Sequence, residues 1–165
     1  MNLRTFGNKP RSLRNTILLA GFAGGVAEIL WVAIYSFFAH ASGSLIAVQI
    51  AASLWPSLLS VPAGISIHLA LSLMLGSFFA VMIWLPYVRQ RGGVATLVSA
   101  IVVLTSVWAV NFFIILPVIN PSFATLMPYW ATLVSKLLFG ITMAGMLNGF
   151  PNTNRPRFTA FGWIA

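Results

Sequence analysis

Glu28 is the only acidic residue among the 165 of this chain, and it lies within an apolar stretch from Ile17 to Phe38. A carboxylate at membrane depth is costly, so such a residue normally pairs with a cation or takes part in moving ions or protons. Lys136 is the one basic residue of the last apolar stretch, Tyr129 to Phe150. These two side chains are therefore the first candidates for chemistry or for an intramembrane ion pair.

The rise of an α-helix predicts the level of each charge. Glu28 follows Asn15 by 13 residues, and Lys136 precedes Phe150 by 14 residues. Each residue would therefore lie ~20 Å from the same face of the membrane, although the two helices run in opposite directions. Because buried charges in membranes normally pair, we predict an ion pair between Glu28 and Lys136, either direct or bridged by water.

Two further polar residues lie at a predicted level of about 27–29 Å from that face, namely His68 and Asn111. Together with Glu28 and Lys136 they would form a polar column. The column has two interpretations: it fastens the helices to one another, or it provides a path for protons or a solute. Transporters usually have internally repeated bundles and broken helices around their site, and four helices are few for that.

Small residues accompany these polar residues at helical spacing, so that each polar side chain shares a helix face with small ones. Small residues let membrane helices approach closely, and polar residues then hydrogen-bond across the contact. The residues that we expect at such helix contacts are Gly21, Gly25, Ser72, Gly76, Gly140 and Ala144.

The chain has few groups for metal binding or catalysis. It has no Cys or Asp, and its only His residues are His40 and His68, which helical rise separates by about 9 Å. One carboxylate cannot form an acid–base pair with another, and no nucleophile has an evident base. We therefore expect no metal ion, no cofactor and no enzymatic activity, although one ligand to a site shared with another subunit stays open.

Composition places the chain in a membrane. Hydrophobic residues make up 59% of it and charged residues 6%, whereas roughly a quarter of a soluble domain is charged. Residues 16–150 are predicted to be an all-α integral membrane bundle of four transmembrane helices, each about 20 residues or longer. The predicted spans are Thr16–Ala39, Pro62–Leu85, Val94–Pro117 and Tyr129–Phe150.

All basic residues except Lys136 flank these spans on one side. They lie in an N-terminal segment (1–15), between the second and third spans, and in a basic and aromatic tail (151–165). Because cytoplasmic loops carry the excess of Lys and Arg, we predict that both termini are cytoplasmic. These residues would contact anionic lipid rather than nucleic acid: Arg11, Arg14, Arg89, Arg91, Arg155 and Arg157.

The segment from Ser44 to Ser60 is apolar and uncharged, but Pro56 interrupts it after Trp55. A fifth span here would move Arg89 and Arg91 to the opposite face, against the charge pattern. We therefore expect a short interfacial or re-entrant helix in the first outer loop, anchored by Trp55.

Three segments together resemble the small four-helix bacterial inner-membrane proteins of the YagU-like type. They are Gly64-Ile-Ser-Ile-His68 with Ser72 and Gly76, Val110-Asn-Phe-Phe-Ile-Ile-Leu-Pro117, and Lys136-Leu-Leu-Phe-Gly140. The last segment often begins with His in that pattern, where this chain has Lys136. The resemblance implies a multi-pass protein of the bacterial inner membrane and brings no established activity.

Two functions are consistent with this inventory. The first hypothesis is a non-catalytic accessory subunit of a larger membrane complex, which contacts other integral-membrane subunits and lipids or a hydrophobic cofactor. The alternative is a small transporter or proton-conducting protein that uses Glu28, Lys136 and His68.

Overall fold

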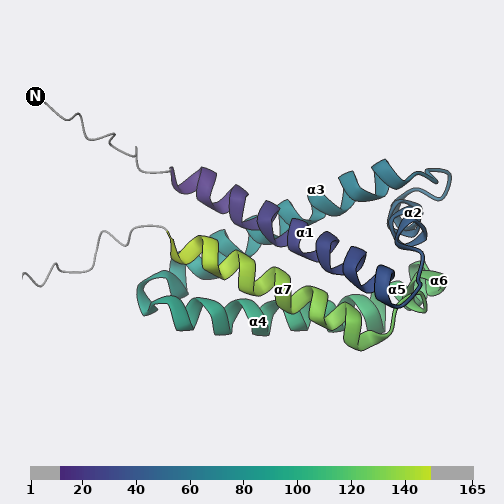
Figure 1. Ribbon diagram of the computed structural model, residues 1–165. Coiled ribbons are helices and arrows are strands. Elements are labelled where there is room, and N and C mark those ends of the chain that lie inside the picture. The colour runs from purple at the N-terminus through teal and green to yellow at the C-terminus, as the bar shows by residue number, and fades with distance from the viewer. Residues whose placement is uncertain (1–11, 150–165) are drawn as a thin grey trace, which may run out of the picture.

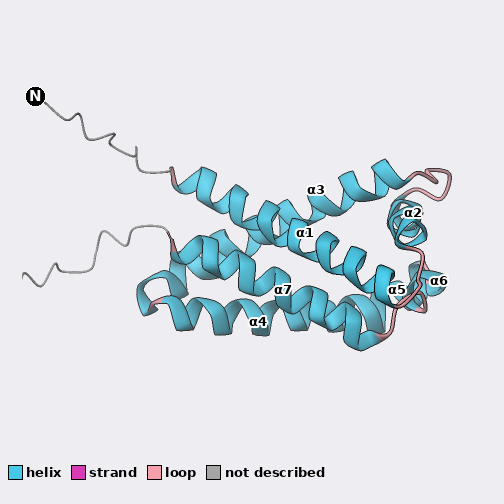
Figure 2. Ribbon diagram, viewed as in Figure 1, coloured by secondary structure: helices cyan, strands magenta, loops and turns pink. Residues whose placement is uncertain are grey.

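The structure is a computed structural model that describes residues 12–149. These residues are helical apart from short connections (Figure 2), so the expected all-α class is confirmed for them. Four helical segments are long and apolar enough to cross a membrane, which indicates a multi-pass membrane protein. They are Leu13–Phe38, Val61–Arg91, Gly93–Ile119 and Tyr129–Asn148.

The observed helices differ from the predicted ones mainly at their ends. The first begins at Leu13, three residues before the predicted start of the span at Thr16, because Ser12 caps the helix by accepting from the Asn15 amide. The second continues to Arg91, six residues beyond its predicted end. The elements in chain order are α1 (Leu13–Phe38), α2 (Gly43–Leu54), α3 (Val61–Phe79), η1 (Ala80–Val88), η2 (Arg89–Arg91), α4 (Gly93–Val110), η3 (Asn111–Ile115), α5 (Leu116–Ile119), α6 (Pro121–Ala124) and α7 (Tyr129–Asn148).

Two of the long segments change their helical winding near a proline. The π-helix η1 contains Pro86, and the π-helix η3 ends two residues before Pro117. Proline lacks an N–H group, and its ring clashes with the carbonyl four residues earlier. Single-turn π segments are one way in which a helix accommodates such a disturbance, and they occur frequently at functional sites. The third span therefore changes from α-helical to π-helical winding at Asn111 and stays continuous.

The bundle is ordered around α1, which crosses between α3 and α7, while α4 packs on α7 (Figure 1). The described chain begins and ends at one end of the bundle, here called the terminal end. Helices α2, α5 and α6 lie at the other end, here called the α2 end. At the terminal end η1 contacts α4, and from there α3 and α4 diverge.

The small-residue face of α1 packs against the corresponding face of α3. A Cβ atom added to Gly25 would lie 2.6 Å from the Ser72 hydroxyl oxygen, and one added to Gly76 would lie 2.5 Å from the Gly21 Cα. The two helices are antiparallel at this contact. Continuing along it, the next residue of α1 after Gly25 is Glu28, and the next residue of α3 before Ser72 is His68. Close backbone approach is thus what brings these two polar residues together.

The small residues of α7 pack in another direction. A Cβ atom added to Gly140 would lie 3.1 Å from Leu104 of α4, so Gly140 lies in the contact between α4 and α7. Lys136 lies in the contact between α1 and α7, where it pairs with Glu28. Ala144 is buried in the main apolar core. On α1, Gly24 provides room for the ring of Phe139, a contact that the sequence analysis did not identify.

The segment from Ser44 to Ser60 contains one helix, α2, which begins at Gly43 and ends at Leu54 before Trp55 and Pro56. Its 12 residues are too few to span a bilayer. The backbone of Ala47 lies against Gly64 of α3, where any side chain would collide with the Ala47 carbonyl. Asn120 also holds α2, because its amide nitrogen donates to Gln49 Oε1 at 3.1 Å and to Ser53 Oγ at 2.9 Å.

Candidate functional site

Glu28 forms an ion pair with Lys136 in the interior of the bundle. Lys136 Nζ lies 2.7 Å from Glu28 Oε1, and the Ser135 hydroxyl donates to the same oxygen at 3.1 Å. Glu28 is 1% exposed, so water at the surface of the protein cannot solvate it. Lys136 Nζ also lies 5.6 Å from the centroid of the Phe139 ring, which places the cation over an aromatic face. The expected pair is therefore direct.

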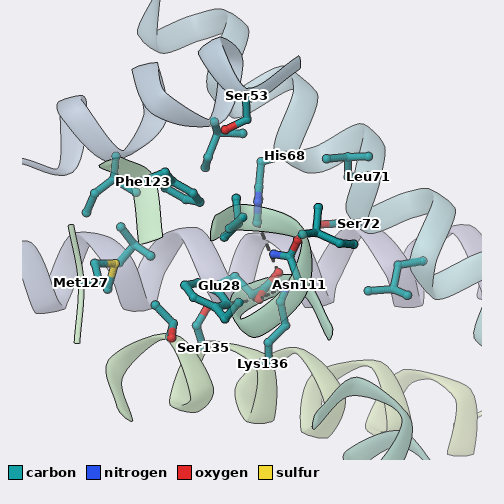
Figure 3. A pocket seen from close by; sticks show the side chains of 18 of the residues that line it. Glu28, Ser53, His68, Leu71, Ser72, Asn111, Phe123, Met127, Ser135 and Lys136 are labelled. Atoms are coloured by element: carbon teal, nitrogen blue, oxygen red, sulfur yellow. Dashed lines mark hydrogen bonds and ion pairs between the residues drawn. The ribbon is translucent and has the colours of Figure 1, made fainter. Parts of the chain in front are cut away.

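His68 approaches the same carboxylate from another helix. Its Nε2 atom lies 3.4 Å from Glu28 Oε2. This distance is within the range of an ion pair, and neither atom has a hydrogen bond to any other described group. Figure 3 shows His68 and Lys136 directed at Glu28 from opposite sides. One carboxylate oxygen is thus paired with Lys136 and Ser135, and the other is paired with the imidazole of His68.

The predicted level of His68, above Glu28 and Lys136, is wrong, since all three residues meet. Helical rise gives depth only along an upright helix, and α3 is inclined relative to α4 (Figure 1). The nine-residue π segment η1 between His68 and the terminal end further changes the advance along the helix. The polar residues therefore form a cluster rather than a column.

The fourth residue of the predicted column, Asn111, lies beside this cluster (Figure 3). It is the first residue of the π-helix η3 and is partly buried. Asn111, Glu28, His68, Ser135 and Lys136 all line one cavity of about 280 Å³. The π-helical winding of the third span thus begins at the place where polar side chains line the cavity.

The cavity has a polar end and apolar walls. The five polar residues named above form the polar end, to which Ser72 and Thr132 add hydroxyl groups. The apolar walls come from six helical elements, α1, α2, α3, η3, α5 and α6, and from Met127 in the connection before α7. Their apolar residues include Val32, Ile46, Ile50, Leu75, Phe112, Leu116, Phe123 and Met127.

The cavity opens through a rim of exposed apolar residues. Leu71 on α3, Ile115 on η3, Leu54 on α2 and Ile119 on α5 line the cavity, and they are between 41 and 59% exposed. The rim therefore lies where α3 diverges from the third span and where α2 covers the α2 end of the bundle. Leu71, Ile115 and Ile119 belong to segments that are long and apolar enough to cross a membrane, whereas Leu54 ends the shorter helix α2.

The structure describes three of the arginines that the sequence suggests as lipid contacts. Arg14 and Arg91 are exposed at the terminal end, and the guanidinium of Arg89 lies 5.7 Å from the centroid of the Trp84 ring. Arg11, Arg155 and Arg157 lie outside the described residues. Between residues 12 and 149, no group of three or more His, Cys, Asp or Glu side chains is placed to hold a metal ion.

Sequence reasoning did not identify Ser135 as a partner of Glu28, the cavity, or the Asn120 contact that holds α2. Two local signals were available. Ser135 is adjacent to Lys136, and Asn120 stands directly before Pro121 at the start of α6, where its side chain accepts from the Phe123 amide. Neither signal identifies the distant partner.

Comparisons of the chain with protein-family models, with curated proteins and with solved structures found no match. The resemblance to YagU-like proteins therefore stays a prediction, and the function must be argued from the site.

Proposed function

We propose that this protein is a membrane-embedded binding protein that takes a lipid-soluble small molecule into the cavity beside Glu28. The single observation that carries this proposal is an apolar cavity with the buried cluster of Glu28, His68 and Lys136 at one end. Polar groups that only fasten helices need no open space beside them, whereas these three residues line the cavity. A cavity with apolar walls and a few convergent polar groups is instead typical of a ligand site.

Binding of this kind is also the first step of transport. Single-turn π segments occur frequently at functional sites, and here the π-helix η3 begins at Asn111, which lines the cavity. The chemistry of the cluster serves binding rather than turnover, because it offers one carboxylate that Lys136 already neutralises. The proposed protein is therefore non-catalytic.

The test compares two substitutions at adjacent positions of η3. Ile115 lines the cavity, whereas its neighbour Ile114 is exposed and does not. The protein is extracted with its surrounding lipid, and small molecules that remain bound are identified by native mass spectrometry. Ile115→Trp is expected to remove the bound molecule, and Ile114→Trp to retain it. The same occupancy in both variants would contradict the proposal, as would an empty cavity in the unaltered protein.

An accessory role in a larger complex is the second candidate. The observation that favours it is the shortness of the connections between the described helices, which leave no separate domain for an independent activity. Such a subunit would hold its ligand for a neighbouring integral-membrane protein. Mild extraction followed by native gel electrophoresis is expected to show stoichiometric partners, and a lone monomer or homodimer would contradict this role.

The proposed location is a bacterial inner membrane, with the terminal end on the cytoplasmic side. Supporting this orientation, the described chain starts and ends at the same end of the bundle, where Arg14, Arg89 and Arg91 also lie. Basic residues gather on the cytoplasmic side of membrane proteins, where they attract anionic lipid head groups. α2 would then lie at the outer interface.

A further inference from the structure

The side chain of Asn111 is a polar group of the cavity without a partner. Asn111 belongs to the third membrane-crossing segment, where it is partly buried. Its carboxamide lines the cavity and forms no hydrogen bond with another described residue. An amide in an apolar medium is costly without hydrogen bonds. A partner for Asn111 must therefore come from outside the described chain.

The other polar side chains of the cavity are less suited to hold a ligand. Ser72 is only 3% exposed, and its hydroxyl oxygen lies against Gly25 of α1. Glu28 is 1% exposed and is enclosed by its partners. The polar residues that line the cavity and already have partners within the described chain are Glu28, Ser53, His68, Thr132, Ser135 and Lys136. Asn111 is therefore the side chain through which the cavity can hold a head group.

The carboxamide of Asn111 presents a donor and an acceptor side by side. Its nitrogen donates hydrogen bonds, and its oxygen accepts them. A head group that satisfies both must carry an acceptor and a donor at the same spacing. A primary amide and a protonated carboxylic acid do so, since each has a C=O group and an N–H or O–H group on one carbon. A hydroxyl has a single oxygen, which cannot reach both atoms of the amide in good geometry.

Charge separates a neutral head group from an ionic one. Glu28 and Lys136 already neutralise each other at 2.7 Å. A ligand ammonium or carboxylate beside Asn111 would bring an uncompensated charge into the bundle, which is costly in an apolar interior. A neutral amide or acid completes the hydrogen bonds of Asn111 and leaves the ion pair unchanged.

Cavity size and the rim decide what carries the head group. An engineered cavity of about 150 Å³ binds benzene, so a cavity of about 280 Å³ accommodates roughly a dozen non-hydrogen atoms by proportion. Its walls are mainly aliphatic. The rim residues Leu71, Ile115 and Ile119 are between 41 and 59% exposed and belong to membrane-crossing segments, so a longer tail can continue from the cavity into the lipid.

We infer that the ligand is a neutral amphipathic molecule with a carboxamide or protonated carboxyl head group, which pairs with Asn111 through two hydrogen bonds. This inference rests on the proposed binding function and specifies its ligand class. The head group donates to Asn111 Oδ1 and accepts from Asn111 Nδ2. The aliphatic tail passes Ile115 and leaves the cavity between Leu71 of α3 and Ile119 of α5.

The experiment uses decanamide, whose dozen or so non-hydrogen atoms suit the cavity. A decanamide that carries a photoreactive diazirine in its chain is irradiated with the full-length protein in lipid nanodiscs, and labelled residues are mapped by mass spectrometry. Labelling is expected on cavity residues such as Ile115 and Leu71. Unlabelled decanamide, N,N-dimethyldecanamide, decanoic acid, decylamine and decane are then added as competitors at matched mole fractions in the lipid.

Decanamide is expected to displace the probe at roughly fivefold lower mole fraction than N,N-dimethyldecanamide, because the dimethyl compound cannot donate and one net hydrogen bond contributes about 1 kcal/mol. Asn111→Leu has a similar shape and should abolish this difference. Asn148→Leu is the control, since Asn148 lies outside the cavity and donates to the Gly93 carbonyl, and it should retain the difference. Because the competitor series is run first on the unaltered protein, it decides the head group even if Asn111→Leu does not fold.

Decanoic acid and decanamide are compared at about pH 5 and about pH 8 to separate the two head groups. A carboxylic acid loses its O–H group above its ordinary pKa of about 4, so decanoic acid should compete better at the lower pH. The titratable groups that line the cavity are Glu28, His68 and Lys136, and decanamide, which does not titrate, controls for any change in them. The compound that acts at the lower mole fraction at about pH 5 identifies the head group.

The other outcomes separate this inference from the proposed function. Equal displacement by decanamide, its dimethyl derivative and decane would overturn the head group and leave the cavity as a binding site. Stronger displacement by decylamine, or by decanoic acid at the higher pH, would overturn it in favour of a charged ligand. An undiminished preference for decanamide in Asn111→Leu would overturn the role of Asn111. Labelling that avoids the cavity residues altogether would overturn both the inference and the binding function.

Discussion

The ion pair between Glu28 and Lys136 makes a quantitative prediction about stability. Methionine is an unbranched apolar substitute of similar length for both residues, so the variants are Glu28→Met, Lys136→Met and the double substitution. Each single variant leaves one charge in the bundle without its partner at 2.7 Å. The double variant leaves neither charge. We expect the single variants to be less stable than the double variant.

The two single variants should not be equal. Removing one member of a buried pair typically costs about 3–5 kcal/mol of unfolding free energy, whereas replacing both is often nearly neutral. Lys136→Met should lie in this range, because the remaining Glu28 carboxylate is 1% exposed and has a short side chain. The Lys136 side chain is 19% exposed, and long lysine side chains can turn their charge toward a polar boundary. We therefore expect a smaller cost, about 1–3 kcal/mol, for Glu28→Met.

The assay is reversible unfolding of the purified protein in mixed detergent micelles, followed by circular dichroism, with a double-mutant cycle. With a nearly neutral double variant, the expected interaction energy has a magnitude of about 4–8 kcal/mol, above the usual range for residues in contact. Ser135→Ala is the control, since it removes one hydrogen bond to Glu28 and should cost about 0.6 kcal/mol, as interhelical bonds in membranes do. Additive single effects, or a double variant as unstable as the worse single one, would refute the reasoning.

Three further predictions concern packing and topology. Gly64→Ala should loosen α2, because the added methyl group would meet the Ala47 carbonyl, and hydrogen exchange over residues 43–54 should become faster. Gly145→Ala is the control, since its methyl group meets nothing within 4 Å, and it should leave this exchange unchanged. Asn120→Ala should increase exchange at residues 49–53 while leaving α7 unchanged, since its amide donates to Gln49 and Ser53; equal exchange in α2 would contradict the holding role. The chain has no Cys, so Ser57→Cys should react with an impermeant maleimide on intact cells and Gln90→Cys should not; the reverse pattern would contradict cytoplasmic termini.

Much of the architecture was predictable because composition and spacing act locally. An apolar run of about 20 residues is sufficient to indicate a spanning helix, and Trp55-Pro56 indicates where α2 ends. The pairing of Glu28 with Lys136 was also predictable, since a single carboxylate and a single intramembrane lysine lie at matching depths on their helices. Gly21 and Gly25 indicated the face of α1 that packs closely, and that face contacts α3.

The composition of the site was not predictable in the same way. The depth calculation separated His68 from Glu28, yet the structure places Nε2 within 3.4 Å of the carboxylate. Gly140 belongs to the same stripe as Lys136 but faces α4. These errors share a cause. The spacing of residues along a helix specifies neither how that helix is inclined nor which neighbouring helix each residue of a stripe contacts.

The sequence by itself therefore determined the class, the four spans, the short intervening helix and the charges that must find one another in an apolar medium. Only the tertiary structure decided that α3 would diverge from the third span, that η3 would place Asn111 beside the ion pair, and that a cavity would remain there. The physical reason is that depth and hydrophobicity are properties of single helices. Crossing, rotation and empty space arise only from how several helices pack together.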